Sequence, residues 1–156
     1  MEALYNLLNN FERLDQDIQF KKFFDITEHK AFVISRNTWG QLFEMGVDAF
    51  SRPLPTYRPS TVKRRGGVKG DGTPFRVGEH YTLRDYGNFY QSFQVKAYKG
   101  FLEIDADTLK MHDGKTLFNP DDVVGLTDDS KEKLVDYMLE TNFIPNDILE
   151  TVLQFD

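Results

Sequence analysis

The stretch from Leu83 to Val95 constrains the fold most, because a turn signal, a charge pair and a dense aromatic run coincide there. Asp85, Gly87 and Asn88 predict a turn, since Asp and Asn side chains bond to nearby backbone and Gly87 can adopt a positive φ. The adjacent Arg84 offers a charge partner for Asp85. We therefore interpret Asp85 and Gly87 as structural turn residues without a catalytic role.

The aromatic residues after this turn predict where a sheet begins. Phe89 and Phe93 are four residues apart, which suits one helical turn, and Phe93 and Val95 are two apart, which suits one face of a strand. A hairpin is expected next, with strands over residues 92–97 and 101–106. The stretch thus predicts a turn, a short helical turn that sends both Phe side chains into the core, and then a strand.

The first 50 residues predict helices. Apolar residues at helical spacing indicate an amphipathic helix over residues 2–24, and Thr27 is a candidate N-cap for the element that follows. Two adjacent apolar stripes favour one long helix over residues 28–50, covered on two sides. The alternative is a short strand over residues 32–35, with a helix that begins after Asn37 as its cap.

The C-terminal part predicts further short elements. A short strand is possible over residues 115–118, and a turn is expected over residues 119–122. Thr127 caps a helix that ends at Asn142, and the acidic residues after Thr127 suit the positive end of its dipole. Pro145 opens a last short helix. The apolar face expected on the helix after Thr127 consists of Leu134, Val135, Met138 and Leu139.

Together these elements predict a single α+β domain over residues 1–156, with N-terminal helices packed on a small antiparallel sheet and with C-terminal helices. Its parts are a helical region over residues 1–50, a basic Pro/Gly-rich loop over residues 51–78, and a sheet with C-terminal helices over residues 79–156. The composition, with 40% hydrophobic and 28% charged residues, is that of an ordinary soluble globular domain. No apolar run is long enough to span a bilayer, so no membrane partner is expected.

Charge is distributed unevenly along the chain. The net charge is −6, yet residues 58–84 are basic and residues 105–156 are strongly acidic. With Tyr57 and Phe75 beside them, the cations of the loop could follow a phosphate backbone. The favoured interpretation is an arm that orders against an acidic protein surface, such as a neighbouring copy, so that residues 66–72 become ordered only in an assembly. The candidate cations are Arg58, Lys63, Arg64, Arg65, Lys69 and Arg76.

Metal chemistry finds little support in the sequence. The chain has no Cys, which excludes disulfides and thiolate metal sites. His29, His80 and His112 are scattered, without the spacing of a zinc site. Asp105 and Asp107 begin like a calcium loop, but the later ligand and Gly positions of such a loop are not matched. No cofactor and no metal are therefore expected.

A small metal-dependent nuclease or processing enzyme is the enzymatic alternative. Asp121, Asp129 and Lys131 superficially offer its two carboxylates and lysine. That chemistry needs the second acid and the lysine on a strand, whereas Asp129 and Lys131 lie at the N-terminus of a predicted helix. No Ser or Thr lies in a motif that would activate it as a nucleophile. We expect a protein that is not an enzyme.

Four pieces of the chain, in order, resemble the tail-completion, or virion morphogenesis, proteins of tailed bacteriophages and the related head–tail joining proteins. The first is a basic loop with a Pro-Leu element, here Arg52-Pro53-Leu54 and Pro59-Ser60-Thr61-Val62-Lys63-Arg64. A Leu-x-Asp-Thr-Gly-x-Leu-x-x-Ser-[Ile/Leu/Phe] element corresponds to residues 83–93, and a hairpin strand to residues 101–104. The last piece, Gly125-Leu126-Thr127-Asp128-Asp129, steps into a C-terminal helix.

The chain departs from this family pattern at Tyr86, which replaces a Thr, and between the hairpin and Gly125, where aromatic, His, Gly and Arg-Pro positions are missing. The resemblance implies a structural subunit of the virion neck or tail, made in the cytoplasm of the bacterial host. It implies a homo-oligomeric ring, a hexamer or dodecamer, around the DNA channel, with other neck, portal or tail proteins as partners and possible nonspecific contact with genomic DNA. A DNA-binding module that acts through the basic loop is a second alternative.

Overall fold

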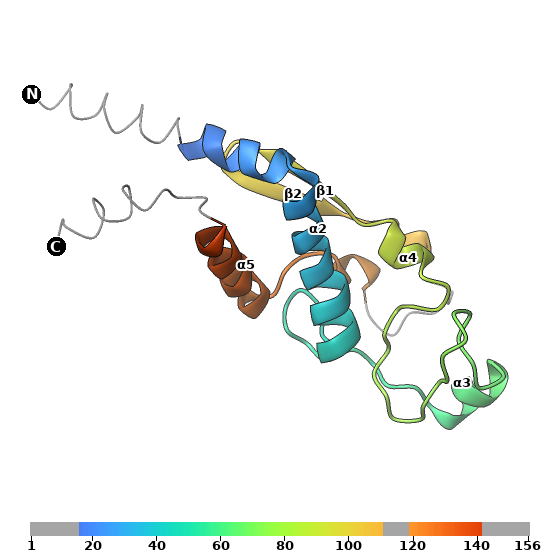
Figure 1. Ribbon diagram of the computed structural model, residues 1–156. Helices are drawn as coiled ribbons and strands as arrows, with labels where there is room; N and C mark the ends of the chain where they lie inside the picture. The colour runs from blue at the N-terminus through green and yellow to red at the C-terminus, as the bar shows by residue number, and fades with distance from the viewer. Residues whose placement is uncertain (1–15, 111–118, 142–156) are drawn as a thin grey trace, which may run out of the picture.

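The computed structural model describes residues 16–110 and 119–141, and these residues adopt the predicted α+β fold (Figure 1). A helix over residues 16–25 and helix α2 (Thr27–Ser35) lie beside a two-stranded antiparallel sheet. Helix α5 (Asp128–Glu140) lies to the left of α2 and below the sheet in Figure 1. The shorter helices are α3 (Pro59–Arg64), α4 (Asn88–Gln91) and the 3₁₀ turns η2 (Thr108–Lys110) and η3 (Pro120–Val123).

The sheet consists of β1 (Gln94–Tyr98) and β2 (Phe101–Asp105), with Tyr98 opposite Phe101. β1 therefore begins two residues later than the predicted strand over residues 92–97. Its buried residues, Val95 and Ala97, pack against Phe23, Phe24 and Val33 of the two helices before the sheet. The strand alternates buried and exposed residues because only one of its faces meets the helices.

The predicted turn before the sheet is confirmed. Gly87 has a φ of 86° and precedes α4 directly, and β1 follows two residues after Ser92. Phe89 and Phe93 are both buried, with their ring centroids 5.1 Å apart. They belong to a core that also contains Leu42, Leu54, Tyr90 and Val123.

The favoured single helix over residues 28–50 is confirmed against the alternative strand, but it ends earlier than expected. α2 runs directly into η1 (Arg36–Met45), a π-helix, and Gly46 ends it with a φ of 64°. Within η1, the Thr38 hydroxyl donates to the Ile34 carbonyl one turn earlier, at 2.8 Å. At the other end, Ile26 and not Thr27 is the N-cap, and it offers no side-chain acceptor.

Two buried amides on η1 hold the segment that leads into α5. Asn37 donates to the Val123 carbonyl at 3.1 Å and accepts from the Gly125 N–H at 2.9 Å. Gln41 donates to the Gly125 carbonyl and accepts from the Thr127 N–H, both at 2.9 Å. Because side chain and backbone satisfy each other, this amide clamp fixes residues 123–127 on the helix without a buried polar group left unpaired.

The start of α5 agrees with prediction. Thr127 is its N-cap, accepting from the Ser130 N–H at 3.2 Å. Asn119 caps η3 in the same way, where the sequence indicated a turn. The predicted strand over residues 115–118 and the helix after Pro145 lie outside the described residues, as do most of the helix over residues 2–24 and the predicted end at Asn142.

Candidate interaction surfaces on the arm and on helix α5

Residues 56–82 form an arm that leaves the body of the molecule and returns to it (Figure 1). The two ends of this segment meet at an isolated antiparallel bridge between Thr56 and His80. Tyr57 anchors this stem with its backbone, because its N–H donates to the Glu79 carbonyl at 2.8 Å and its carbonyl accepts from Gly78 at 2.9 Å. The chain therefore folds the Pro/Gly-rich segment into a defined projection.

The tip of the arm consists of α3 and a small turn that folds back beside it. α3 begins at Pro59, whose missing N–H costs nothing in the first helical turn. Behind it, Lys69 donates its N–H to the Thr73 carbonyl at 2.7 Å, and Phe75 donates to the Gly67 carbonyl at 2.9 Å. These bonds join the two sides of the turn around residues 70–72.

Lys69 lies inside the arm rather than on its surface. Its side-chain nitrogen lies 3.5 Å from a Glu79 carboxylate oxygen and 3.4 Å from the Thr82 hydroxyl. The rings of Tyr57 and Phe75 lie beside the same nitrogen, at 5.6 and 5.7 Å from their centroids. Lys69 is only 6% exposed, so it neutralises Glu79 and is not available to a partner. Burial also raises the pKa of the Tyr57 hydroxyl.

Asp85 fastens the tip of the arm to the turn before the sheet. Its carboxylate accepts from the Gly70 N–H at 2.6 Å and pairs with Arg65 at 3.0 Å, and its carbonyl accepts from the Asp71 N–H at 2.9 Å. The expected Asp85–Arg84 pair is wrong, because Arg84 pairs with Asp71 at 3.0 Å. Hydrogen bonds from Thr73, with the Arg84 charge beside them, hold the pKa of Asp71 below its usual value.

The cations of residues 58–85 divide into paired and unpaired groups. The segment contains seven Lys and Arg residues and three carboxylates, a formal charge of +4. Each carboxylate takes one cation: Asp71 takes Arg84, Glu79 takes Lys69 and Asp85 takes Arg65. The four cations left are exposed and have no acidic partner among residues 16–110 and 119–141; they are Arg58, Lys63, Arg64 and Arg76.

The structure thus brings the six candidate cations to one arm but separates their roles. Four of them face solvent, together with the exposed side chains of Val68 and Val77. Tyr57 and Phe75, which the sequence placed beside the cations as possible base-stacking groups, turn inward and meet each other edge to face at 4.9 Å. Lys69, Gly70 and Asp71 of the loop over residues 66–72 donate backbone hydrogen bonds to Thr73 and Asp85 of the same chain, and the ordering of this loop by assembly stays a prediction.

Helix α5 carries the acidic counterpart of the arm. Leu134 and Met138 of its predicted apolar face pack inward, beside Tyr137, which stacks on Phe32 at 3.8 Å. Val135 and Leu139 were assigned to the same face, but they are 54% and 42% exposed. The orientation of α5 about its axis explains this difference. Residues four apart share a face of the helix, and the row of Ser130, Leu134 and Met138 faces the core.

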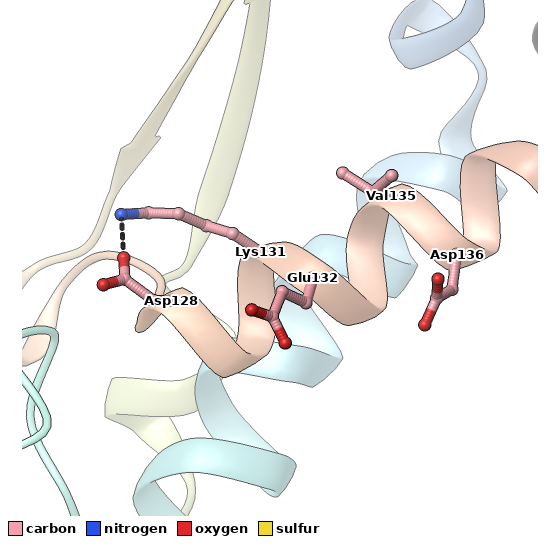
Figure 2. A pocket seen from close by; sticks show the side chains of 5 residues that line it. All are labelled: Asp128, Lys131, Glu132, Val135 and Asp136. Carbon is pink, nitrogen blue, oxygen red and sulfur yellow. Dashed lines mark hydrogen bonds and ion pairs between the residues drawn. The ribbon is translucent and has the colours of Figure 1, made fainter. Parts of the chain in front are cut away.

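Acidic residues border these two apolar side chains. An open pocket of about 380 Å³ on the outer side of α5 is lined by Asp128, Lys131, Glu132, Val135 and Asp136 (Figure 2). Lys131 pairs with Asp128 at 2.9 Å, which lowers the pKa of that carboxyl. Lys133 pairs with Asp129 at 2.7 Å. Glu132, Asp136 and Glu140 are exposed and pair with no cation in the described part of the chain.

The residues considered for metal chemistry are scattered over the fold. His29 stacks on Phe23 at 3.8 Å and shares a 2.7 Å hydrogen bond with the Tyr137 hydroxyl. His80 donates from Nε2 to the Phe43 carbonyl at 2.8 Å. His112 lies outside the described residues.

The carboxylates of the nuclease alternative are likewise dispersed. Asp105 ends β2, while Asp107 accepts from the Leu109 N–H at 3.2 Å. Asp121 lies in η3, and Asp129 and Lys131 are each paired with another residue of α5. Within residues 16–110 and 119–141, no three His, Asp or Glu side chains gather to hold a metal ion.

Searches with the whole chain found no matching family model, no curated relative and no similar solved structure. Among the described helices, none combines the length and the apolar character needed to cross a membrane. The candidate site is thus defined by its own geometry, as an exposed cationic surface on the arm, without acidic partners in the described part of the chain, and an acidic, partly apolar surface on α5.

Proposed function

We propose that this chain is a non-enzymatic structural subunit of a bacteriophage virion, which assembles as a ring in the neck or tail. The proposal rests on the family resemblance of its loop, turn, hairpin and C-terminal helix, and on the surfaces that the fold presents. The chain supplies the subunit contacts of the ring, at the head–tail connection or in tail completion.

A single observation carries the proposal: unpaired charges of opposite sign lie on opposite sides of one molecule. Among residues 16–110 and 119–141, four cations of the arm and three carboxylates of α5 have no partner of opposite charge, and α5 lies on the far side of α2 and η1 from the arm (Figure 1). A ring needs two different and complementary faces, because each subunit meets its neighbour head to tail. Opposite charges on the two faces would also set the direction of assembly.

Native mass spectrometry and negative-stain microscopy of the purified full chain test this proposal. We expect closed rings, hexamers or dodecamers, that become more abundant as protein concentration rises. A monomer at every concentration and ionic strength, including with purified neck and tail proteins of the same phage, would overturn the assembly role. Metal-dependent cleavage of single- or double-stranded DNA, tested with Mg²⁺ and Mn²⁺, would overturn the non-enzymatic assignment.

A further inference from the structure

We infer that the arm of one copy docks on the outer face of α5 of the next copy. This inference rests on the proposed assembly into rings and adds which two surfaces form the contact. Val68 and Val77 of the arm lie against Val135 and Leu139, while the free cations of the arm meet the free carboxylates of α5. The occupant of the α5 face is thus a second copy of the same chain.

The arm presents a preformed surface that suits docking on another protein. Its surface combines two exposed apolar side chains, Val68 and Val77 at 51% and 58% exposure, with the four unpaired cations. Three internal ion pairs and the Asp85 anchor hold its shape before any partner is met. A preformed surface loses less conformational entropy on binding than a flexible segment would.

The α5 face has matching chemistry. Val135 and Leu139 are one helical turn apart and form an exposed apolar strip. Glu132 and Asp136 line the pocket beside Val135 (Figure 2), and Glu140 is the last residue of the helix. A surface with an apolar centre and charged margin is typical of protein–protein contacts.

The two surfaces belong to one chain but cannot meet within it. Figure 1 shows α3 and the rest of the arm on one side of α2 and η1, and α5 on the other. The amide clamp of Asn37 and Gln41 fixes α5 in place, and Asp85 fixes the arm. Contact between the arm and α5 therefore requires a second copy. Because each copy offers one arm and one α5 face, the same contact can repeat from copy to copy until a ring closes.

Charge distinguishes this occupant from two competitors. Residues 142–156 include three acidic residues and no Lys or Arg, so they would bring like charge to the α5 face. Nucleic acid would neutralise the cations of the arm, but the inward-facing rings of Tyr57 and Phe75 provide no stacking surface for bases. The acidic, partly apolar face of a second copy matches both the charge and the apolar character of the arm.

Thiol cross-linking tests the contact directly, because the natural chain has no Cys. Chains carrying Val77→Cys and chains carrying Val135→Cys, distinguished by mass, are mixed and treated with a short bifunctional thiol cross-linker. We expect a mixed dimer as the main product, and from Val77→Cys/Val135→Cys in one chain a ladder of covalent oligomers. Val77→Cys mixed with Gln94→Cys, an exposed position on the outer face of β1, is the matched control and should give little product.

Charge reversal provides the second test. Glu132→Lys/Asp136→Lys removes two attractions and adds two repulsions, so we expect self-association to weaken about tenfold or more. Mixing this variant with Arg64→Glu/Arg76→Glu should recover most of the association. Glu103→Lys/Asp105→Lys, which makes the same charge change on the exposed side of β2, is the control and should behave like the natural chain.

The outcomes separate this contact from the proposed function. Rings that form normally in Glu132→Lys/Asp136→Lys, without a Val77–Val135 cross-link, would overturn the contact and leave ring assembly standing. A monomeric natural chain would overturn both. An intramolecular cross-link in the double-Cys chain, full association after removal of residues 64–76, or tight binding of duplex DNA that competes with association would also count against the arm–α5 contact.

Discussion

At the scale of single residues, alanine substitutions at two glycines should distinguish the cost of backbone strain from the cost of a steric clash. Gly46 and Gly87 both have positive φ, at 64° and 86°. A Cβ at Gly46 would lie 2.3 Å from the His80 ring, whereas a Cβ at Gly87 would meet nothing closer than Gln91 at 3.9 Å. We expect Gly87→Ala to lower the unfolding free energy by about 1–2 kcal/mol through strain alone.

Gly46→Ala should cost more, because the same strain is joined by displacement of His80, whose ring donates to the Phe43 carbonyl. The added overpacking is worth about 1–3 kcal/mol. Urea denaturation of the two variants measures the difference. Equal losses would contradict the packing of His80 on Gly46, and a fully stable, assembling Gly87→Val variant would contradict the structural role of the turn.

Two buried phenols predict how stability changes at alkaline pH. Burial raises the pKa of both Tyr57 and Tyr90, and the Tyr90 hydroxyl donates to the Thr82 carbonyl at 2.5 Å. A raised folded-state pKa means that the stabilisation is complete below the unfolded value of about 10 and is lost as the pH rises above it. The unfolding free energy should therefore fall above about pH 10.

Tyr57→Phe/Tyr90→Phe should flatten this alkaline fall. The same variant should lose about 1 kcal/mol at neutral pH, because the Thr82 carbonyl loses its donor. Denaturant unfolding from pH 7 to 11 measures both effects, and Tyr86→Phe, which removes an exposed phenol, is the matched control. If the unfolding free energy of the double variant fell with pH as steeply as that of the natural chain, these two phenols would not stay neutral in the folded protein.

Single-residue pairings were the least predictable feature of the sequence. The turn residues and the burial of Phe89 and Phe93 follow from local chemistry and spacing, and both are confirmed. The ion-pair partner of Asp85 cannot be predicted in this way. Arg84 is adjacent in sequence, but the actual partner is Arg65, which is 20 residues away. Ion pairing depends on where the arm folds back, and spacing along the chain carries no signal for that.

At the scale of elements, the amide clamp on η1 makes the strongest prediction. Gln41→Leu would leave the Gly125 carbonyl and the Thr127 N–H without partners in a buried site. Each orphaned group costs about 1–3 kcal/mol, so we expect a loss of about 2–6 kcal/mol and a looser start of α5. Urea denaturation measures the loss, and Gln19→Leu, on an exposed helical position, is the control. Equal stability of the two variants would contradict the clamp.

Helix boundaries and faces were only partly predictable. Apolar spacing indicates one long helix before residue 50 and a capped helix after Thr127, and both exist. The early stop at Gly46 and the π-helical turns depend on contacts with the arm and with residues 123–127. Val135 and Leu139 fit an apolar stripe as well as Leu134 and Met138 do, so only packing decides which pair is buried.

The folded arm predicts amide protection in a single chain. The N–H groups of Gly67, Lys69, Asp71 and Phe75 all donate to carbonyls at 2.7–3.0 Å. Hydrogen exchange on the monomer at low concentration should slow at these amides. Asp85→Asn should reduce the protection of the Gly70 N–H, because a neutral amide is a poorer acceptor than a carboxylate, while the Asp71 N–H keeps its acceptor, the Asp85 main-chain carbonyl. Exchange at the random-coil rate in the monomer would contradict this expectation and support the prediction that residues 66–72 become ordered only in an assembly.

At the scale of the whole molecule, charge separation predicts a salt response that differs between folding and assembly. The pairs that hold the arm, such as Lys69 with Glu79, are partly or largely buried, while the free charges of the arm and of α5 face water. Exposed charges are screened over about 8 Å at physiological ionic strength, and buried pairs are screened much less. Self-association should therefore weaken steeply from about 50 to 500 mM NaCl, while the unfolding free energy of the monomer changes little.

Analytical ultracentrifugation and urea denaturation across the same salt series measure the two quantities side by side. Arg58→Gln/Lys63→Gln/Arg64→Gln/Arg76→Gln removes the four free cations of the arm and should flatten the salt dependence of association without unfolding the chain, because none of these residues holds an internal pair in the described part of the chain. Association that strengthens with salt would assign the contact to apolar surface alone. If association of the four-Gln variant still weakened steeply with salt, the charged contact would lie elsewhere on the molecule.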